Sequence, residues 1–534
     1  MKFLKSFRIL AIALTLATIG AVIPAVPVLA ATIAITPNSG PAGTEVFVTA
    51  GDFTGGSPTS TVYVRLDEYT TSGTLLETTT IGEITTEGVI VTIPEGTSGG
   101  EHLIWVVRSG ASADRASESF WVLPRLSSIN PDNGKVGDTI NVEGDGFVSE
   151  APSVYFYWDE VRITSGIQSS SPIVNADGEL NNVRIAAPPS LRGEHELVAE
   201  DRKNENSRTD PMTFTVESKL TVSPASGGVG DTLTLTGTGF GGGAVSIFFD
   251  QQVLTTANVP TTGSNAGSFT QTITVPPTSA GSHTIKAVDT EEVSVTFNLS
   301  QQITVTPTTP LFVGDSITVN GSGFALNQPV TVTLDNLPIT ITPTPFTTPS
   351  GTFTTTFAVP AASKGDHVLR VQAGSGAASQ ATITIKEKIT ALAPTNGPGG
   401  TAVRVSGTGF TPGSATVNFD DVSIGSISVE ANGSFTNATF NVPANAASGP
   451  HTITIQGVTA PSFTVDPKLT LSPTSGVSGN TINVTGTGFG SQKTISFIID
   501  NLYGLVVTPS PVVSDQSGNI TASFCIASKL FYTF

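Results

Sequence analysis

The sequence predicts an all-β protein made of a tandem array of β-sandwich modules, and three observations support this prediction. The composition favours strands and turns, because Thr, Ser, Gly and Val dominate and only 12% of the 534 residues are charged. One pattern of strand, Pro/Gly turn and strand starts six times along the chain. Within each copy, apolar and polar residues alternate with the period of two that indicates a half-buried strand.

The chain begins with a segment, residues 1–30, that has the features of a secretory signal peptide. Three basic residues precede an apolar run, and Val28-Leu29-Ala30 forms a cleavage site of small residues. Pro24 and Pro27 interrupt the run before it is long enough to span a bilayer comfortably, and an uncleaved anchor is the alternative. We therefore expect an exported protein, extracellular or at the cell surface, with no transmembrane segment after the signal.

Each module begins with a strand and a turn, followed by a strand that ends in a Gly-x-Gly-Phe corner, as in VSPASGGVGDTLTLTGTGF. The corner phenylalanines are Phe53, Phe147, Phe240, Phe324, Phe410 and Phe489. Successive corners are 79 to 94 residues apart, which suits whole domains and is too long for solenoid repeats. The predicted modules span residues 31–124, 125–217, 218–300, 301–386, 387–466 and 467–534.

The remaining strands of each module follow in a constant order. After the corner, an alternating strand such as VSIFFD ends at an aspartate in all six copies, namely Asp67, Asp159, Asp250, Asp335, Asp420 and Asp500. In the first five modules, a turn, another alternating strand, a strand with a histidine and a closing strand follow. This makes about seven short antiparallel strands in a module.

These segments resemble the IPT/TIG family of immunoglobulin-like domains, in which a Pro-x-Ser-Gly turn, a Gly-x-Gly-Phe corner and an alternating strand recur. The first copy departs from the pattern, with Ala50 and Asp52 where the others have glycine. The resemblance covers nearly all of the chain after the signal and implies six immunoglobulin-like β-sandwiches, the last one incomplete. For function it implies a surface receptor, a bacterial surface protein, an enzyme accessory module or a DNA-binding protein.

The net charge narrows these classes of function, and the cysteine content limits how the modules can be stabilised. The formal net charge of −18 excludes nucleic acid as a partner, because nucleic-acid binding needs a basic footprint. Cys525 is the one cysteine, so no disulfide can form within the chain and each module must be held by core burial.

The five histidines occupy one position of the repeat, always two residues after a glycine: His102, His195, His283, His367 and His451. Each has the parity of the core residues of its strand, so we expect the ring to fill the rim of the sandwich and to donate an N–H to a backbone carbonyl. The alternative is a metal ligand. That would need two or three further ligands nearby, and these modules each offer one histidine and no cysteine.

The strand-ending aspartates suggest calcium as an alternative to a structural role. Calcium requires six to eight oxygens, and the sequence has no D-x-D-x-D loop. We therefore expect these aspartates to accept backbone N–H groups in the turn, with structural calcium left open but unsupported by a motif. No cofactor and no catalytic residue are predicted. Gly237, Gly239 and Gly242 match G-x-G-x-x-G, but a strand rather than a helix follows them.

Outward-facing aromatic residues are the candidate contacts for a ligand or partner. Tyr155 and Tyr157 face out of the strand VYFYWDE. Tyr63 in the first module matches the position of Tyr155, and Phe248 in the third module matches that of Tyr157. Such rings can stack on a sugar or anchor a protein. The alternative is that tyrosine is simply a good strand former.

The last module departs from the repeat after Ala527, where SKLFYTF replaces the two final strands. Truncation is one explanation, and a strand supplied by another chain is the other. The linkers between modules are short and lack a Gly/Ser tether, which predicts a rod of roughly 180 Å if each sandwich is roughly 30 Å long.

We expect a non-catalytic secreted or cell-surface protein, either a stalk, an adhesin or a component of a cell-envelope layer. Its expected partners are other surface proteins or further copies of itself, and carbohydrate is a further candidate. The alternative is the accessory portion of a large extracellular hydrolase whose catalytic domain lies outside this chain.

Overall fold

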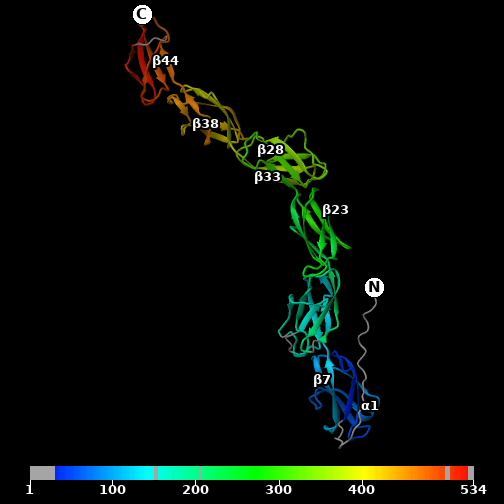
Figure 1. The fold of residues 1–534 in the computed structure, drawn as a ribbon. Helices are drawn as coiled ribbons and strands as arrows, with labels where there is room; N and C mark the ends of the chain where they lie inside the picture. Colours follow the sequence, from blue (N-terminus) through cyan, green and yellow to red (C-terminus); the bar gives the residue numbers. More distant parts are fainter. Residues whose placement is uncertain (1–30, 150–153, 172, 205–206, 500–505, 527–534) are drawn as a thin grey trace.

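The computed structural model describes residues 31–149, 154–171, 173–204, 207–499 and 506–526. The expected signal peptide, Asp500 and the predicted departure after Ala527 lie outside these residues. The described part of the chain is almost entirely β-structure, as expected, and its modules follow one another end to end along a curved path (Figure 1).

The first two modules have the following elements. The first contains β1 (Thr32–Thr36), β2 (Ser39–Gly40), β3 (Glu45–Gly51), β4 (Thr61–Leu66), β5 (Thr74–Thr80), α1 (Ile81–Thr86), β6 (Val89–Thr92), β7 (Gly100–Arg108) and β8 (Arg115–Val122). The second contains β9 (Arg125–Asn130), β10 (Asn133–Lys135), β11 (Thr139–Asp145), β12 (Val154–Trp158), β13 (Val161–Arg162), β14 (Ile167–Gln168), β15 (Val183–Ala186), β16 (Gly193–Asp201), β17 (Ser207–Arg208) and β18 (Met212–Glu217).

The third and fourth modules repeat this order with fewer short strands. The third contains β19 (Lys219–Ser223), β20 (Ser226–Gly227), β21 (Thr232–Thr238), β22 (Gly243–Phe249), β23 (Gln252–Val259), β24 (Phe269–Thr274), β25 (Gly281–Val288) and β26 (Glu292–Leu299). The fourth contains β27 (Gln302–Thr306), β28 (Ser316–Ser322), β29 (Val330–Leu334), β30 (Leu337–Ile339), β31 (Phe353–Ala358), β32 (Gly365–Ala373) and β33 (Ala378–Ile385).

The remaining elements belong to the last two modules. The fifth contains β34 (Lys388–Ala393), β35 (Asn396–Gly397), β36 (Ala402–Thr408), β37 (Gly413–Phe419), β38 (Val422–Val429), β39 (Phe435–Asn441), β40 (Gly449–His451), β41 (Ile453–Ile455), β42 (Val458–Thr459) and β43 (Phe463–Val465). The sixth contains β44 (Lys468–Ser472), β45 (Thr481–Thr487), β46 (Thr494–Ile495), β47 (Val507–Thr508), β48 (Val512–Val513) and β49 (Ile520–Cys525).

Each of the first four modules has two sheets, the fifth has three because its second layer is divided into β35-β43-β40 and β38-β37-β41-β42, and the third module shows the common plan. One sheet has the order β19-β21-β24 and the other has β20-β26-β25-β22-β23. Neighbouring long strands are antiparallel, whereas the short strand β20 pairs with β26 in parallel. This arrangement places the strand that ends in the repeated aspartate, β22, beside the strand that begins near the repeated histidine, β25.

The alternating residues of both sheets point inward and form a separate apolar core in each module. The buried side chains of the described residues form six clusters, and each cluster draws its residues from one of the six expected ranges. The corner residues Phe147, Phe240, Phe324 and Phe410 are completely buried, and Phe53 and Phe489 pack against their clusters from the edge. The sixth cluster is the smallest, and β44 is exposed along its whole length.

The short helix α1 is the main departure from the repeat among the described residues. Its N-terminus is capped by Thr80, whose hydroxyl accepts the N–H of Glu83, and Ile84 fills part of the first core. None of the helical segments in the described ranges has the length and hydrophobicity of a membrane span.

Candidate functional site

A histidine and an aspartate from neighbouring strands meet at the same place in each of the first five modules. In the third module β22 and β25 are antiparallel, and Phe249 at the end of β22 lies opposite Ile285. Asp250 therefore follows β22 beside the first residues of β25, where His283 points into the rim of the sandwich. We call this arrangement the His–Asp clamp.

Both ring nitrogens of each clamp histidine are engaged. Nε2 lies 2.7–2.8 Å from the carbonyl oxygen of the residue four positions earlier, namely Ser98, Leu191, Ser279, Ser363 or Ala447. Nδ1 lies 2.5–2.9 Å from a carboxylate oxygen of Asp67, Asp159, Asp250, Asp335 or Asp420. The expected bond to a backbone carbonyl is thus confirmed in all five modules.

Four of these aspartates accept a backbone N–H, as expected, but the expected location in the turn was wrong. The second carboxylate oxygen accepts the N–H of the residue after the histidine, on the neighbouring strand. The backbone N–H of the aspartate in turn donates to the carbonyl of that same residue, at 2.7 Å between Asp250 and Thr284. Asp250 has a positive φ of 52°, a conformation that aspartate tolerates better than most residues, and this bends the chain toward β25.

The side chains of the clamps are partly buried. The histidine side chains are 9–13% exposed and the aspartates 45–53% exposed. Burial opposes the charge of the His102 ring, but the Asp67 carboxylate and the Ser98 carbonyl outweigh burial and raise the pKa of His102 above its ordinary value of 6.5.

In three other clamps it is the pKa of the aspartate that is shifted. Burial opposes ionisation of Asp250 and Asp420, yet the backbone N–H and imidazole that they bond lower the pKa of both carboxyls below 3.8. At Asp335 the bond from His367 is the largest cause and lowers the pKa in the same direction.

This geometry leaves the clamp histidines no free ring nitrogen for a metal ion. Among the described residues, no group of three or more His, Cys, Asp or Glu side chains is placed to hold a metal. The ring instead stacks on an aromatic core residue in three modules: Trp158 at 5.3 Å, Phe249 at 5.0 Å and Phe419 at 4.6 Å between ring centroids.

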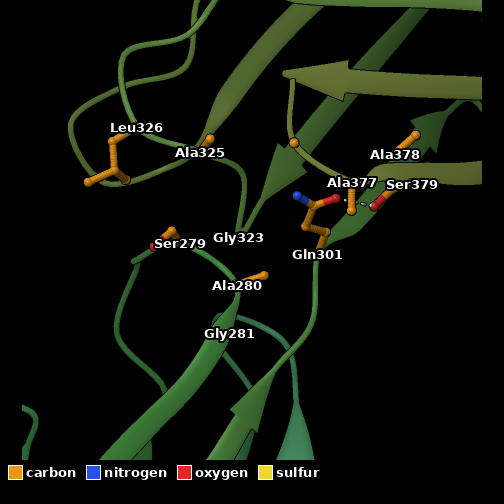
Figure 2. A pocket seen from close by; sticks show the side chains of 11 residues that line it. Ser279, Ala280, Gly281, Gln301, Gly323, Ala325, Leu326, Ala377, Ala378 and Ser379 are labelled. Atoms are coloured by element: carbon orange, nitrogen blue, oxygen red, sulfur yellow. Dashed lines mark hydrogen bonds between the residues drawn. The ribbon is translucent and has the colours of Figure 1, made fainter. Parts of the chain in front are cut away.

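The loop held by the clamp is also the loop that contacts the next module. In the first module, the peptide group of Ser98 and Gly99 accepts from His102 through its carbonyl and donates through its N–H to the carbonyl of Phe147, at 2.7 Å. In the third module, the peptide group of Ser279 and Ala280 does the same, with Gly323 as the acceptor at 2.7 Å (Figure 2). One peptide group thus connects the imidazole to the following module.

We call the contact between two successive modules a joint. At two other joints, the residue after the carbonyl bonded by the histidine is a cation. Arg192 donates to Asp289 of the third module at 3.0 Å, and both side chains are largely buried, at 17% and 7% exposed. Lys364 approaches Glu387 at 3.4 Å. Burial opposes ionisation of Asp289, but the N–H of Glu291, the Arg192 guanidinium and the N–H of Gly241 lower the pKa of its carboxyl.

Two recesses open at joints. One of about 700 Å³ lies between the third and fourth modules, where Ala280, Gly323 and Leu326 line it together with Gln301, which bonds Ser379 (Figure 2). The other, of about 830 Å³, lies between the second and third modules. Its lining includes Trp158, Val161, Arg162, Pro188, Pro189, His195 and Thr262.

The four predicted aromatic contact residues are half-buried on strand faces, and arginines cover the tyrosine rings. The Arg162 guanidinium lies 3.5 Å from the ring centre of Tyr155, and that of Arg208 lies 4.2 Å from Tyr157. Arg65 lies 5.3 Å from Tyr63. Phe248 lies opposite Lys286 on the neighbouring strand. Their role as ligand contacts stays a prediction.

Sequence reasoning treated the histidines and the aspartates separately and missed the clamp. The signal was present, because in every clamp the aspartate precedes the histidine by 31 to 36 residues. It also missed Arg192 and Asp289, whose meeting depends on how two modules pack rather than on any local pattern.

Comparisons with known proteins agree with this architecture. The family model of the IPT/TIG domain matches residues 124–216, which correspond to the second module. No match was found among curated protein sequences.

Solved structures of several kinds of protein match this chain at low identity and low TM-score. The eight N-terminal Ig domains of Down syndrome cell adhesion molecule share 13% identity, over 94% of this chain and 70% of theirs, with a TM-score of 0.17. The SGBP-B protein of a Bacteroides ovatus mixed-linkage glucan utilization locus, solved with a heptasaccharide, shares 14% identity over 60% and 92%, with a TM-score of 0.20. Identities this low speak to the fold alone.

Proposed function

We propose that this chain, a tandem repeat of IPT/TIG-like immunoglobulin-like modules, is a non-catalytic extracellular or cell-surface protein that works as a stiff spacer and presents binding modules. The joints are the observation that supports this proposal most strongly. A free string of domains needs no ordered contact between neighbours, whereas the clamped loops bond directly to the next module at Phe147 and Gly323. Bending at these joints would break hydrogen bonds that the neighbouring modules share.

The uneven distribution of polar and aromatic side chains supports a division of labour along the chain. All three tryptophans lie in the first two modules, as do the Tyr–Arg stacks described above. The later modules are rich in Thr and Ser and carry few charges. We place the binding end in modules one and two and the spacer in the rest, with other surface proteins or further copies of this chain as partners.

Labelling of intact producing cells with an antibody against modules one and two tests this proposal. We expect strong labelling that is lost after brief protease treatment of the intact cells. Signal that appears only after the cells are permeabilised would contradict a surface role.

The recess between the second and third modules favours carbohydrate as a second candidate ligand. Its lining combines the apolar side chains of Pro188, Pro189 and Val161 with the guanidinium of Arg162 and the hydroxyl of Thr262. Sites that combine a few polar groups with an apolar surface in a concavity are typical of small-ligand binding. This candidate is also compatible with the role of an accessory portion of a larger extracellular hydrolase.

A glycan array tests the carbohydrate candidate. We expect retention of the unmutated chain on at least one glycan and its loss in Thr262→Trp, which fills the recess. Val422→Trp serves as a matched control, because Val422 is 67% exposed on a hairpin of the fifth module, far from the recess. No retention of the unmutated chain would rule out this candidate and leave the spacer proposal intact.

A further inference from the structure

Each His–Asp clamp presents only hydrogen-bond acceptors to its imidazole. In the clamp of His283, Nε2 faces the Ser279 carbonyl at 2.8 Å and Nδ1 faces the Asp250 carboxylate at 2.7 Å. A neutral imidazole has one N–H and one lone pair, so one ring nitrogen would then point its lone pair at an acceptor. Both contacts are hydrogen bonds only when the ring carries both protons and is a cation.

The surroundings of Asp250 favour its ionised form. The other Asp250 oxygen accepts the N–H of Thr284, and the charge of Lys286, which pairs with Glu292 at 2.9 Å, also lowers the pKa of Asp250. The residue that lies opposite His283 on β26 is Phe297, which cannot exchange protons. The residues opposite the other four clamp histidines are also apolar: Phe120, Phe214, Ile383 and Phe463.

The cationic ring acts on the next module through the peptide group that it holds. A charged donor makes a stronger bond to the Ser279 carbonyl than a neutral one would. Hydrogen bonds in a chain polarise one another, so this also strengthens the bond from the Ala280 N–H to Gly323. Loss of the ring charge leaves one ring nitrogen, Nδ1 or Nε2, with a lone pair that faces an acceptor, and the ring and its loop must shift to relieve that contact.

We propose that protonation of the clamp histidines sets the stiffness of the array, so that the joints are held while the rings are cations and loosen when the rings become neutral. This inference goes beyond the spacer role and does not depend on what the chain binds.

The direction of the pKa shifts defines the pH window. Because the pKa of His102 is raised from 6.5, the stability contributed by its clamp is complete below pH 6.5 and is lost as the pH rises through the pKa of the folded state. Because the pKa of Asp250 is lowered from 3.8, the contribution of that carboxylate is present above pH 3.8 and is lost as the pH falls through its folded pKa. In these two clamps, the histidine contribution is therefore lost above pH 6.5 and the aspartate contribution is lost below pH 3.8.

Asp250→Asn removes the charge of the clamp aspartate and keeps the shape of its side chain. An asparagine oxygen can still accept the Thr284 N–H, and its amide can donate to the lone pair of a neutral His283 ring. The neutral ring still donates through Nε2 to Ser279. In this variant all the contacts are hydrogen bonds when the ring is neutral, and one of them becomes a donor–donor clash when the ring is protonated. The response to pH should therefore be reversed.

Pulsed electron paramagnetic resonance measures this at the joint between the third and fourth modules. Spin labels are attached in the full chain at Thr272→Cys on β24 and Thr356→Cys on β31, both exposed, in a Cys525→Ser background. We expect the distance distribution of the otherwise unmutated chain to be narrow at pH 6 and to broaden at pH 9. In Asp250→Asn it should be narrow at pH 9 and broaden at pH 5.

Asp335→Asn is the matched control, because the clamp of Asp335 and His367 holds the loop at the following joint. It should leave the pH response between the third and fourth modules as in the unmutated chain. The proposal is overturned if the unmutated chain shows no pH response, or if Asp250→Asn responds in the same direction. Nitrogen chemical shifts of the rings give a readout that does not depend on the variant folding. Both ring nitrogens should be protonated at pH 6, and a lone pair at either nitrogen at that pH would overturn the proposal.

Discussion

The joint after the second module and the joint after the third share the same clamp but reach the next module by different means. After the second module, Arg192 extends its guanidinium to the largely buried Asp289. After the third module, the equivalent position is Ala280, whose backbone N–H bonds the carbonyl of Gly323. The array changes direction at this second joint, between the modules labelled by β23 and β28 (Figure 1).

The clamp is therefore the constant part of the joint, and the residue after the carbonyl bonded by the histidine decides how the loop contacts the next module. The residues at this position are Gly99, Arg192, Ala280, Lys364 and Ser448. A small side chain lets the two backbones approach to hydrogen-bond distance, whereas a long cation spans a wider gap to a carboxylate. We call the joint of Arg192 and Asp289 the arginine joint. We expect it to resist bending more than the joint of Ala280 and Gly323, because its two charged side chains are largely buried.

The largest effect is expected from Gly267→Ala, which wedges the arginine joint open. A Cβ on Gly267 would lie 1.9 Å from the carbonyl oxygen of Ser190 in the preceding module, and φ at Gly267 is +71°. Clash and backbone strain together should lower the free energy of unfolding by about 3 kcal/mol, measured by urea denaturation.

Gly263→Ala is the control for this change. Gly263 also has a positive φ, +86°, but a Cβ there would meet nothing within 4 Å. It should cost about 1 kcal/mol, for backbone strain alone. Equal losses in the two variants would show that the close approach at the joint does not exist.

A smaller effect is expected from Arg192→Met, which keeps most of the apolar stem and removes the charge. Asp289 would then lose its ion pair while it stays buried, although the N–H groups of Gly241 and Glu291 still bond it. We expect a loss of about 2 kcal/mol and greater mobility of the joint, measured by urea denaturation and by small-angle scattering. Arg184→Met, at an exposed position of β15, should change stability by less than about 0.5 kcal/mol. An Arg192→Met variant as stable as Arg184→Met would contradict the role given to this ion pair.

The smallest effect is expected from Lys364→Met at the joint after the fourth module. The Lys364 side chain is 47% exposed, so water screens its pair with Glu387. The loss should be about 0.5 kcal/mol and should disappear in high salt. A loss as large as that of Arg192→Met would show that exposure is not what separates the two joints.

The sequence predicted the sandwiches well because their cause is local. Alternation along VSIFFD places Ile247 and Phe249 inside, and both are buried. Parity likewise placed the histidines with the core residues, and the rings lie there. The clamp escaped prediction because the partner of His283 is decided by the pairing of β22 with β25, two strands that are distant in the sequence.

Of the surface contacts, too, some could be predicted from the sequence and others could not. The stack of Arg65 on Tyr63 joins two residues of one strand face and could have been found from parity. The stack of Arg208 on Tyr157 joins β17 to β12, across β16, and could not. The contacts at the joints could not be predicted from the sequence, because the position of Ser190 against Gly267 depends on the packing of two folded modules.

Small-angle X-ray scattering of the full chain tests most directly whether neighbouring modules are held end to end in a defined relation. Six sandwiches of roughly 30 Å predict a single extended particle with a maximum dimension of roughly 180 Å and the cross-section of one module. A particle of half that length, or the scattering of a freely jointed string, would contradict the account.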